Sequence, residues 1–220
     1  MTPRRALVVC AALAAMACAA MTAAAADPLA AWRAGVNYRL LENPQPPDVA
    51  AGKVEVVEAF WYGCSHCFAL DPLLEEWRKT KPAYIEFVRV PVIWSPLHRQ
   101  HAKLYYTLQA LHRSELHAEV FNAIHKRGLV LTDHDEARAR SLQLVFLSGF
   151  GVNPQQFEAA YDSMTVAMNM QRAENFTRTL AVDSVPTVYV NGKYATSAGD
   201  AGGESQLITL INALAESEKR

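Results

Sequence analysis

The spacing of hydrophobic positions changes along the chain and predicts alternating strands and helices in its first part. Runs rich in Val and aromatic residues predict strands at 36–41, 54–60 and 85–92. The run at 54–60 is almost continuously apolar, which is typical of a strand with neighbours on both sides. Apolar residues at helical spacing predict a helix from 64 to about 80, between the second and third of these strands.

The next stretch, 95–181, has helical spacing throughout. Ser95-Pro96 is a typical N-cap and first helical position, and glycines and prolines separate the later helices. The stretch is too long for a single crossover, so we interpret it as a helical subdomain inserted into an α/β core formed by 27–94 and 182–220. The predicted helices lie at 96–112, 115–126, 134–146, 154–163 and 166–179.

Strand character returns after the helical stretch. The residues at 185–190 predict a strand, and the Asn-Gly pair at 191–192 is a strong hairpin signal before a short strand at 193–196. We expect the glycine-rich residues 199–203 to form a flexible link. Apolar residues at helical spacing then predict a final amphipathic helix at 204–215.

Two cysteines, Cys64 and Cys67, stand where the strand at 54–60 turns into the first helix. Their spacing on a first helical turn lets both sulfurs reach bonding distance. Cys64 also lies among the unpaired N–H groups at the positive end of the helix dipole, which favours a thiolate, the form that attacks disulfides. With this order of elements, a C-x-x-C at the first strand-to-helix turn predicts the thioredoxin fold.

Residues 1–26 have the pattern of a secretory signal peptide that is removed from the mature protein. Two arginines precede a short apolar stretch at 6–20, and the alanines at 24–26 provide a small-residue cleavage site. Two alternatives stay open. One is a retained membrane anchor, for which the apolar stretch is short. The other is lipid attachment at Cys18, although the residues before it match a lipoprotein cleavage box poorly.

Composition and charge exclude some classes of partner. The chain has 220 residues and a formal net charge of −1, which becomes −3 when the two arginines of the signal peptide are removed. No basic cluster stands out, so a nucleic acid is not expected as a partner. No long apolar seam indicates an obligate dimer, and we expect a monomer.

Removal of the signal peptide leaves Cys64 and Cys67 as the only cysteines. A bridge between them closes a loop too short to stabilise the fold much, which favours redox chemistry over a structural disulfide. A metal site is a second alternative, in which His66, His98 and His101 join the cysteines. Structural zinc needs four well-placed ligands, however, and a His between two cysteines on one turn points elsewhere. We therefore predict neither a metal nor an organic cofactor.

With its C-x-H-C site, its helical insert and its Val185-Pro186 step, the chain resembles the DsbA family of periplasmic thiol:disulfide oxidoreductases. The resemblance implies that Cys64 is the exposed nucleophile and that buried Cys67 resolves the mixed disulfide. It implies that the peptide bond before Pro186 is cis and that Pro186 faces the cysteines. The alternative is an ordinary trans proline at the start of a strand. It implies that Val185 offers backbone hydrogen bonds to a bound peptide. It also implies reoxidation by a membrane partner of the DsbB type, which passes electrons to quinone.

The two residues between the cysteines tune the thiolate. Many family members carry Pro where this chain has Ser65, so the resemblance alone does not set the reduction potential. His66 can donate a hydrogen bond to Cys64 or carry a positive charge that stabilises its thiolate. The alternative is that His66 is an exposed helix residue without a role.

Glu58 and Arg89 interrupt apolar runs that are expected to be buried, in the strands at 54–60 and 85–92. A buried charge needs a partner. We therefore expect Glu58 to pair with Arg89 beneath the cysteines and to relay a proton to or from Cys67. A buried acid at the matching position of the DsbA family favours this role. The alternative is that each side chain reaches water at the end of its strand.

Together these features predict an exported dithiol oxidase that passes its disulfide to unfolded, cysteine-containing proteins. A thiol reductase or disulfide isomerase on the same fold is the close alternative. Isomerases usually carry a dimerisation domain, for which the chain after residue 27 has no room. A metal-binding or chaperone-like module without redox turnover is the more distant alternative.

Overall fold

The computed structural model describes residues 27–219. The predicted signal peptide at 1–26, with Cys18, lies outside the described residues. Between residues 27 and 219, none of the helices is both long enough and apolar enough to cross a bilayer.

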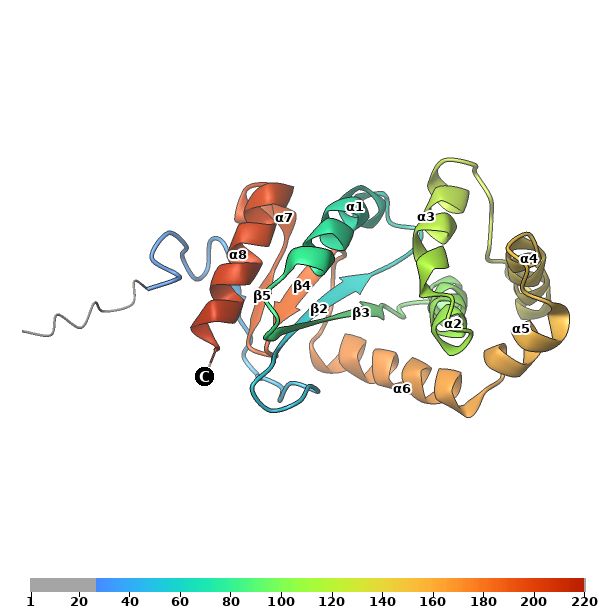
Figure 1. The fold of residues 1–220 in the computed structure, drawn as a ribbon, viewed down its shortest axis with the longest axis horizontal. Helices are drawn as coiled ribbons and strands as arrows, with labels where there is room; N and C mark the ends of the chain where they lie inside the picture. Colours follow the sequence, from blue (N-terminus) through green and yellow to red (C-terminus); the bar gives the residue numbers. More distant parts are fainter. Residues whose placement is uncertain (1–26, 220) are drawn as a thin grey trace, which may run out of the picture.

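Five strands form one mixed sheet (Figure 1). They are β1 (Arg39–Leu40), β2 (Val54–Phe60), β3 (Ile85–Pro91), β4 (Thr187–Val190) and β5 (Tyr194–Thr196). Their order across the sheet is β1-β5-β4-β2-β3. β2 pairs in parallel with β3 and antiparallel with β4, so it has neighbours on both sides, as predicted. The strand predicted at 36–41 is shorter than expected, because only Arg39 and Leu40 pair with β5.

Helices cover both faces of the sheet (Figure 1). They are α1 (Ser65–Thr80), α8 (Glu204–Ser217) and, on the opposite face, α6 (Met164–Thr179). Successive side chains of a strand point to opposite faces. Val54 and Val56 of β2 therefore pack in one core with α1 and α8, whereas Val57 and Ala59 pack in another with the end of α6. β2 thus contributes to both cores, which explains its nearly continuous apolar run.

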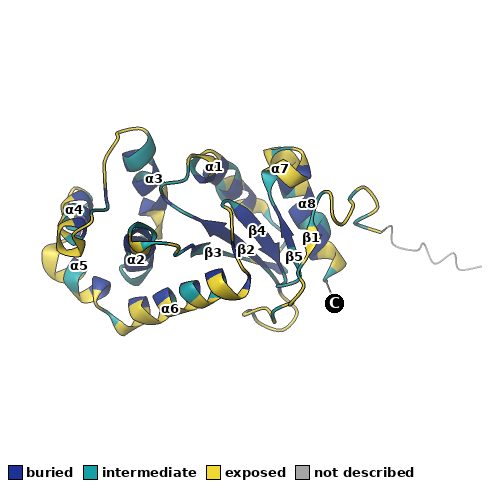
Figure 2. Ribbon diagram, turned by 180° about the vertical axis from the view of Figure 1, so that it is seen from behind, coloured by how far each residue is buried: buried dark blue, intermediate teal, exposed yellow. Residues whose placement is uncertain are grey.

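The helices predicted between the third and fourth strands are present (Figure 1). Before α6 they are α2 (Pro96–Ala110), the 3₁₀ turn η1 (Ser114–Leu116), α3 (His117–His125), α4 (Glu136–Ser148) and α5 (Pro154–Tyr161). Their buried faces form an apolar cluster that also includes Phe60 and Tyr62, while their outer faces are exposed (Figure 2). The division into a core at 27–94 and 182–220 and a subdomain at 95–181 stays a prediction.

A short helix, α7 (Ala198–Ala201), lies where we expected a flexible link. The Ser197 side chain caps it by accepting a hydrogen bond from the N–H of Asp200 at 3.2 Å. Gly202 follows with a φ of +88°, a conformation in which glycine ends a helix without steric cost. The prediction of a flexible link at 199–203 is therefore wrong, because a cap at each end holds these residues in a turn of helix.

Candidate active site

Cys64 is the N-cap residue of α1 and follows the loop that leaves β2. Its sulfur is partly exposed and accepts a hydrogen bond from the backbone N–H of Cys67 at 3.2 Å. An N-cap side chain meets the N–H groups that the first helical turn leaves unpaired. The sulfur is therefore held at the positive end of α1, where a negative charge is stabilised.

The surroundings of Cys64 favour its thiolate. The largest cause is the thiol of Cys67, which donates a hydrogen bond to the Cys64 sulfur. Backbone N–H groups of Cys67 and His66 add to it, and the charge of exposed His66 contributes less. These groups outweigh the effect of partial burial and lower the pKa of Cys64 to about 6. At neutral pH the thiolate is therefore the major form of reduced Cys64.

Cys67 has the opposite character. It is fully buried, and burial raises the pKa of its thiol well above the usual range. Its hydrogen bond to Cys64 and the charge of Glu58 raise that pKa further. The dithiol is thus asymmetric, with one accessible thiolate and one buried thiol that keeps its proton.

The Val185-Pro186 peptide bond is cis, as the resemblance implied. It comes just before β4, which begins at Thr187 and not at 185. The carbonyl oxygen of Val185 lies 3.5 Å from the sulfur of Cys64, within reach of a thiol hydrogen. The backbone of Val185 therefore borders the reactive sulfur.

Glu58 and Arg89 are register partners in the neighbouring strands β2 and β3. The Nε of Arg89 donates a hydrogen bond to Oε2 of Glu58 at 2.8 Å, and their side chains are only 9% and 2% exposed. The predicted pair is confirmed, and the alternative in which both reach water is wrong. Burial raises the pKa of Glu58 to about 7, although the charge of Arg89 opposes it. Glu58 is therefore a buried acid that can gain or lose a proton near neutral pH.

Arg89 also binds two acids from α1, which the sequence did not reveal. It donates hydrogen bonds to Asp71 at 2.9 Å and to Glu75 at 2.6 Å. Burial opposes ionisation of Glu75, but hydrogen bonds from Arg78 and Arg89 outweigh it and lower its pKa to about 2. Three carboxyl groups thus share one guanidinium, and the charges of Asp71 and Glu75 help to keep Glu58 protonated.

His117 extends this buried network to the inserted helices. Its Nδ1 lies 2.9 Å from the hydroxyl of Tyr62, and its Nε2 lies 3.2 Å from Oδ1 of Asp71. Burial raises the pKa of Tyr62 well above its usual range, so its hydroxyl donates and Nδ1 accepts. The neutral ring then carries its proton on Nε2, beside Asp71. The network therefore joins α3 to the sheet through α1.

The histidines of the alternative metal site are held by other contacts. His98 pairs with the Ser95 hydroxyl at 2.8 Å. His101 is 5% exposed, lies against the rings of Trp61 and Tyr62, and has its pKa lowered to about 3 by burial. Across residues 27–219, no group of three or more His, Cys, Asp or Glu side chains is arranged to hold a metal ion.

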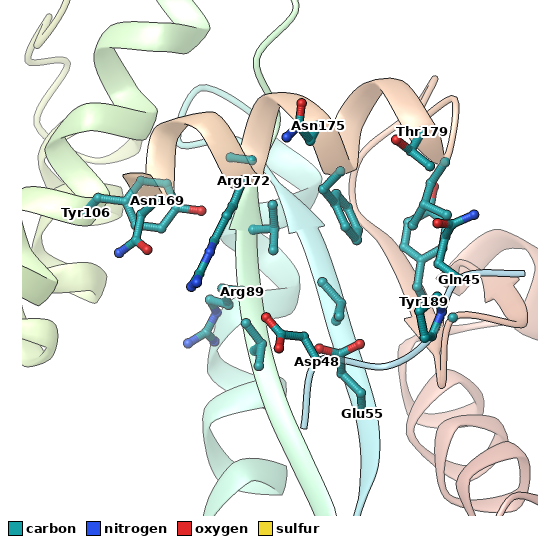
Figure 3. A pocket seen from close by; sticks show the side chains of 18 of the residues that line it. Gln45, Asp48, Glu55, Arg89, Tyr106, Asn169, Arg172, Asn175, Thr179 and Tyr189 are labelled. Carbon is teal, nitrogen blue, oxygen red and sulfur yellow. The ribbon is translucent and has the colours of Figure 1, made fainter. Parts of the chain in front are cut away.

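A cavity of about 420 Å³ lies between α6 and the sheet (Figure 3). Arg172 reaches into it from α6, and Asp48 and Glu55 lie at the opposite wall (Figure 3). Neither cysteine lines it, and neither does Val185. This cavity is therefore separate from the dithiol.

Known proteins resemble this chain over most of its length. A family model described as thioredoxin matches residues 49–209. The thiol:disulfide interchange protein DsbA of Pseudomonas aeruginosa is 35% identical over 189 residues, which cover 86% of each chain. The DsbA of Burkholderia cepacia is 40% identical over 169 residues, or 76% of each chain. The chain belongs to the DsbA family.

Solved DsbA structures have the same fold. The crystal structure of Pseudomonas aeruginosa DsbA has a TM-score of 0.76 and covers 86% of this chain and 95% of its own. DsbA from Xylella fastidiosa, at 26% identity, has a TM-score of 0.77 and covers 85% of this chain and 97% of its own. The predicted thioredoxin fold with inserted helices is therefore confirmed. As a member of the DsbA family, the protein is a thiol:disulfide oxidoreductase.

Proposed function

We propose that this DsbA-family protein is a dithiol oxidase, which donates a Cys64–Cys67 disulfide to folding proteins. The observation that carries the proposal is the contrast between the two sulfurs. Cys64 is partly exposed with a pKa of about 6, whereas Cys67 is buried with a raised pKa. A site that stabilises the dithiol by holding one sulfur as a thiolate makes the corresponding disulfide a stronger oxidant.

The reaction is a pair of thiol–disulfide exchanges. A substrate thiolate attacks the sulfur of Cys64, the Cys64–Cys67 bond breaks, and Cys67 takes up a proton. A second substrate thiolate then attacks the substrate sulfur of the mixed disulfide, and Cys64 leaves as a thiolate. The substrate loses two electrons to the protein, which becomes a dithiol. The low pKa of Cys64 favours the second step, because a stable thiolate is a good leaving group.

Val185, Pro186 and His66 also have roles in this reaction. Substrate segments dock in extended form against the backbone of Val185, next to Pro186, as an added strand would. Binding through the backbone depends little on the substrate sequence, which suits a general oxidant. His66 supports the Cys64 thiolate through its charge.

The setting of the reaction follows from the predicted export signal. We infer that residues 1–26 direct the chain to the periplasm and are removed, and that the mature protein acts as a monomer. Its dithiol is reoxidised there by a membrane quinone reductase of the DsbB type. The substrates are unfolded exported proteins that contain cysteine.

Redox equilibrium with glutathione tests the proposed function against its alternatives. We expect the dithiol to persist in buffers in which most of the glutathione is oxidised, and we expect the disulfide to oxidise a reduced, unfolded protein directly. A pair that stays oxidised in mostly reduced glutathione would identify a reductase and overturn the proposal. Metal bound in the purified protein, detected by mass spectrometry, would favour a metal-binding module.

Glu58 supplies the proton that Cys67 takes up, and replacing it with Gln tests this role. Glu58 is protonated below its pKa of about 7 and becomes an anion above it. We therefore expect Glu58→Gln to release the Cys67 thiol more slowly than wild type in mild acid. Above neutral pH the variant no longer has an anion beside Cys67, so the ratio of variant to wild-type rate should rise with pH through about 7.

The measurement is the rate of disulfide cleavage by a small thiol across this pH range. The ionisation of the attacking thiol affects the rates of both proteins equally, so its effect cancels in the ratio of the two rates. Glu76→Gln is the matched control, because Glu76 is 71% exposed and pairs with Lys79 on the surface of α1. A ratio for Glu58→Gln that does not change with pH would remove Glu58 from the mechanism.

A further inference from the structure

Three carboxyl groups share the guanidinium of Arg89, but their other partners differ. They belong to Glu58, Asp71 and Glu75, and each accepts one hydrogen bond from Arg89, at 2.8, 2.9 and 2.6 Å. Glu75 also pairs with Arg78 at 2.9 Å. Two guanidinium groups thus balance two carboxylates, and a third negative charge would have no counter-charge. Because an unbalanced buried charge is costly, one of the three carboxyl groups keeps a proton.

Glu75 is not the group that keeps the proton. Its side chain is 27% exposed. Burial opposes its ionisation, but hydrogen bonds from both arginines outweigh burial and lower its pKa to about 2. Glu58 and Asp71 have nearly equal bonds to Arg89, and their side chains are only 2% and 7% exposed. Their contacts with Arg89 therefore do not decide which of the two is protonated.

His117 distinguishes Asp71 from Glu58. It is buried at the start of α3, and its Nε2 lies 3.2 Å from Oδ1 of Asp71. Its Nδ1 accepts from the Tyr62 hydroxyl at 2.9 Å, which leaves the ring proton on Nε2. Burial lowers the pKa of His117, so the neutral ring faces Asp71 as a donor without adding a charge. Within residues 27–219, Arg89 is the only side chain that donates to Glu58.

We propose that His117 is a positioning residue, which holds Asp71 as a carboxylate and so leaves the shared proton on Glu58. The inference rests on the proposed function, because the proton matters through its transfer from Glu58 to Cys67. A donor that faces the ionised form of an acid favours that form. Asp71 has two donors and Glu58 has one, so Glu58 is the better acid. Burial raises the pKa of Glu58 to about 7, which agrees with this assignment.

The other groups around His117 and Glu58 do not exchange protons near neutral pH. Burial raises the pKa of Tyr62 and of Tyr105 well above the usual range, and a guanidinium keeps its charge. The proton of the cluster therefore moves only among carboxyl groups. The groups that face His117 are Asp71 and Glu75 on α1, Arg89 on β3, Tyr105 on α2, and Tyr62 after β2, and those that face Glu58 are Arg89, Asp71, Glu75, Tyr105 and Cys67.

Carbon-13 NMR of protein labelled in its Glu and Asp carboxyl groups measures where the proton lies. The oxidised protein is used, so that the dithiol does not titrate, and Glu58→Gln identifies the Glu58 signal. In the wild type we expect Glu58 to titrate at a pH of about 7. His117→Asn has no donor at the place of Nε2, so the proton should move to Asp71. The Glu58 midpoint should then fall by about one pH unit, the size expected for one lost hydrogen bond to a charged group.

Two more variants separate the donor from the rest of the side chain. His117→Gln carries an amide nitrogen near the place of Nε2, so it should restore a Glu58 midpoint close to that of the wild type. His125→Asn is the matched control on the same helix. The ring of His125 stacks on Phe68 and lies 2.8 Å from the Tyr62 carbonyl, so its replacement should leave the Glu58 midpoint unchanged.

Nitrogen-15 NMR of His117 in the wild type tests the same contact without a substitution. At neutral pH the signals should show a neutral ring that carries its proton on Nε2. A ring protonated on Nδ1 would have no donor beside Asp71 and would overturn the inference. This result does not depend on whether a variant at position 117 folds.

The rate of disulfide cleavage by a small thiol connects the proton to the reaction. Just below neutral pH, His117→Asn should release the Cys67 thiol more slowly than wild type, because less of its Glu58 is protonated. In a Glu58→Gln background the same substitution should have no effect, since the group through which it acts is gone. Equal slowing in both backgrounds would show that His117 supports only the packing of α3, and would overturn the inference.

The outcomes distinguish this inference from the proposed function. A Glu58 midpoint that is the same in wild type and His117→Asn overturns the inference and leaves the oxidase standing. A shifted midpoint with unchanged cleavage rates upholds the placement of the proton and overturns the proposed role of Glu58. A dithiol pair that stays oxidised in mostly reduced glutathione overturns the oxidase, while the titration still decides where the proton lies.

Discussion

Replacing Cys67 with Ala is expected to stop turnover completely and to trap the protein as a mixed disulfide. With oxidised glutathione, the Cys64 thiolate displaces one glutathione thiolate and keeps the other glutathione bound. In the wild type, Cys67 attacks this mixed disulfide and releases the second glutathione. Because the variant has no second thiol, the adduct should accumulate. Intact-protein mass spectrometry detects it directly.

The same position also tests why Cys64 is acidic. The hydrogen bond from the Cys67 thiol is the largest cause of the low Cys64 pKa of about 6. Cys67→Ala removes this donor, so the Cys64 pKa should rise clearly towards the value of an ordinary thiol. Cys67→Ser keeps a hydroxyl donor at the same place and should leave the pKa lower than in Cys67→Ala. Ultraviolet absorbance of the thiolate gives both values.

Both variants should trap glutathione, since neither has a resolving thiol, and only the pKa should differ between them. Equal Cys64 pKa values in the two variants would mean that the N–H groups of the first helical turn stabilise the thiolate without a contribution from the side chain at position 67. Turnover by Cys67→Ala would mean that another group resolves the mixed disulfide, which contradicts the proposed mechanism.

The order of elements was predictable because each element carries a local signal. The continuous apolar run identified β2, and Ser95-Pro96 identified the start of α2. The predicted ends of helices were less accurate where a polar capping residue, and not an apolar residue, determines where the helix begins. α6 was predicted from 166 but begins at Met164, because the Ser163 side chain caps it by accepting a hydrogen bond from the N–H of Val166.

The site was predictable only in part, for a physical reason. Glu58 and Arg89 break apolar runs in strands, so their burial and their pairing follow from the pattern. Asp71 and Glu75 occupy polar positions of an amphipathic helix, where acids usually face water. Their contact with Arg89 depends on how α1 crosses the sheet, which spacing along the chain does not encode. His117 reaches Asp71 only because α3 packs beside α1.

The reduced protein is expected to melt at a higher temperature than the oxidised protein at neutral pH. Folding lowers the pKa of Cys64 from about 9, the ordinary value, to about 6. Because this pKa is lower in the folded state, ionisation of Cys64 stabilises the folded dithiol. The stabilisation is complete above a pH of about 9, decreases as the pH falls, and is lost below about 6. The disulfide form has no such thiolate. The difference between the two melting temperatures should therefore shrink as the pH is lowered through 6.

The pKa shift of Glu58 gives the stability of the folded state a pH dependence opposite to that from Cys64. Its raised pKa stabilises the folded state at low pH, and this contribution is lost as pH rises through about 7. Because Glu58 is present in both redox forms, most of this effect cancels in the difference between their melting temperatures. Cys64→Ser is the matched control, since it cannot form the thiolate and its melting temperature should lack the change near 6.

Melting curves for both redox forms and for Cys64→Ser, measured across this pH range, separate the explanations. A difference that does not depend on pH would show that the Cys64 thiolate is not what stabilises the reduced form. An oxidised protein that melts higher at neutral pH would contradict the oxidase function itself, because a disulfide that stabilises the fold is not readily given away. A reduced form that melts higher than the oxidised form only above a pH of about 6 would show that the oxidising power depends on one negative charge, the Cys64 thiolate at the start of α1.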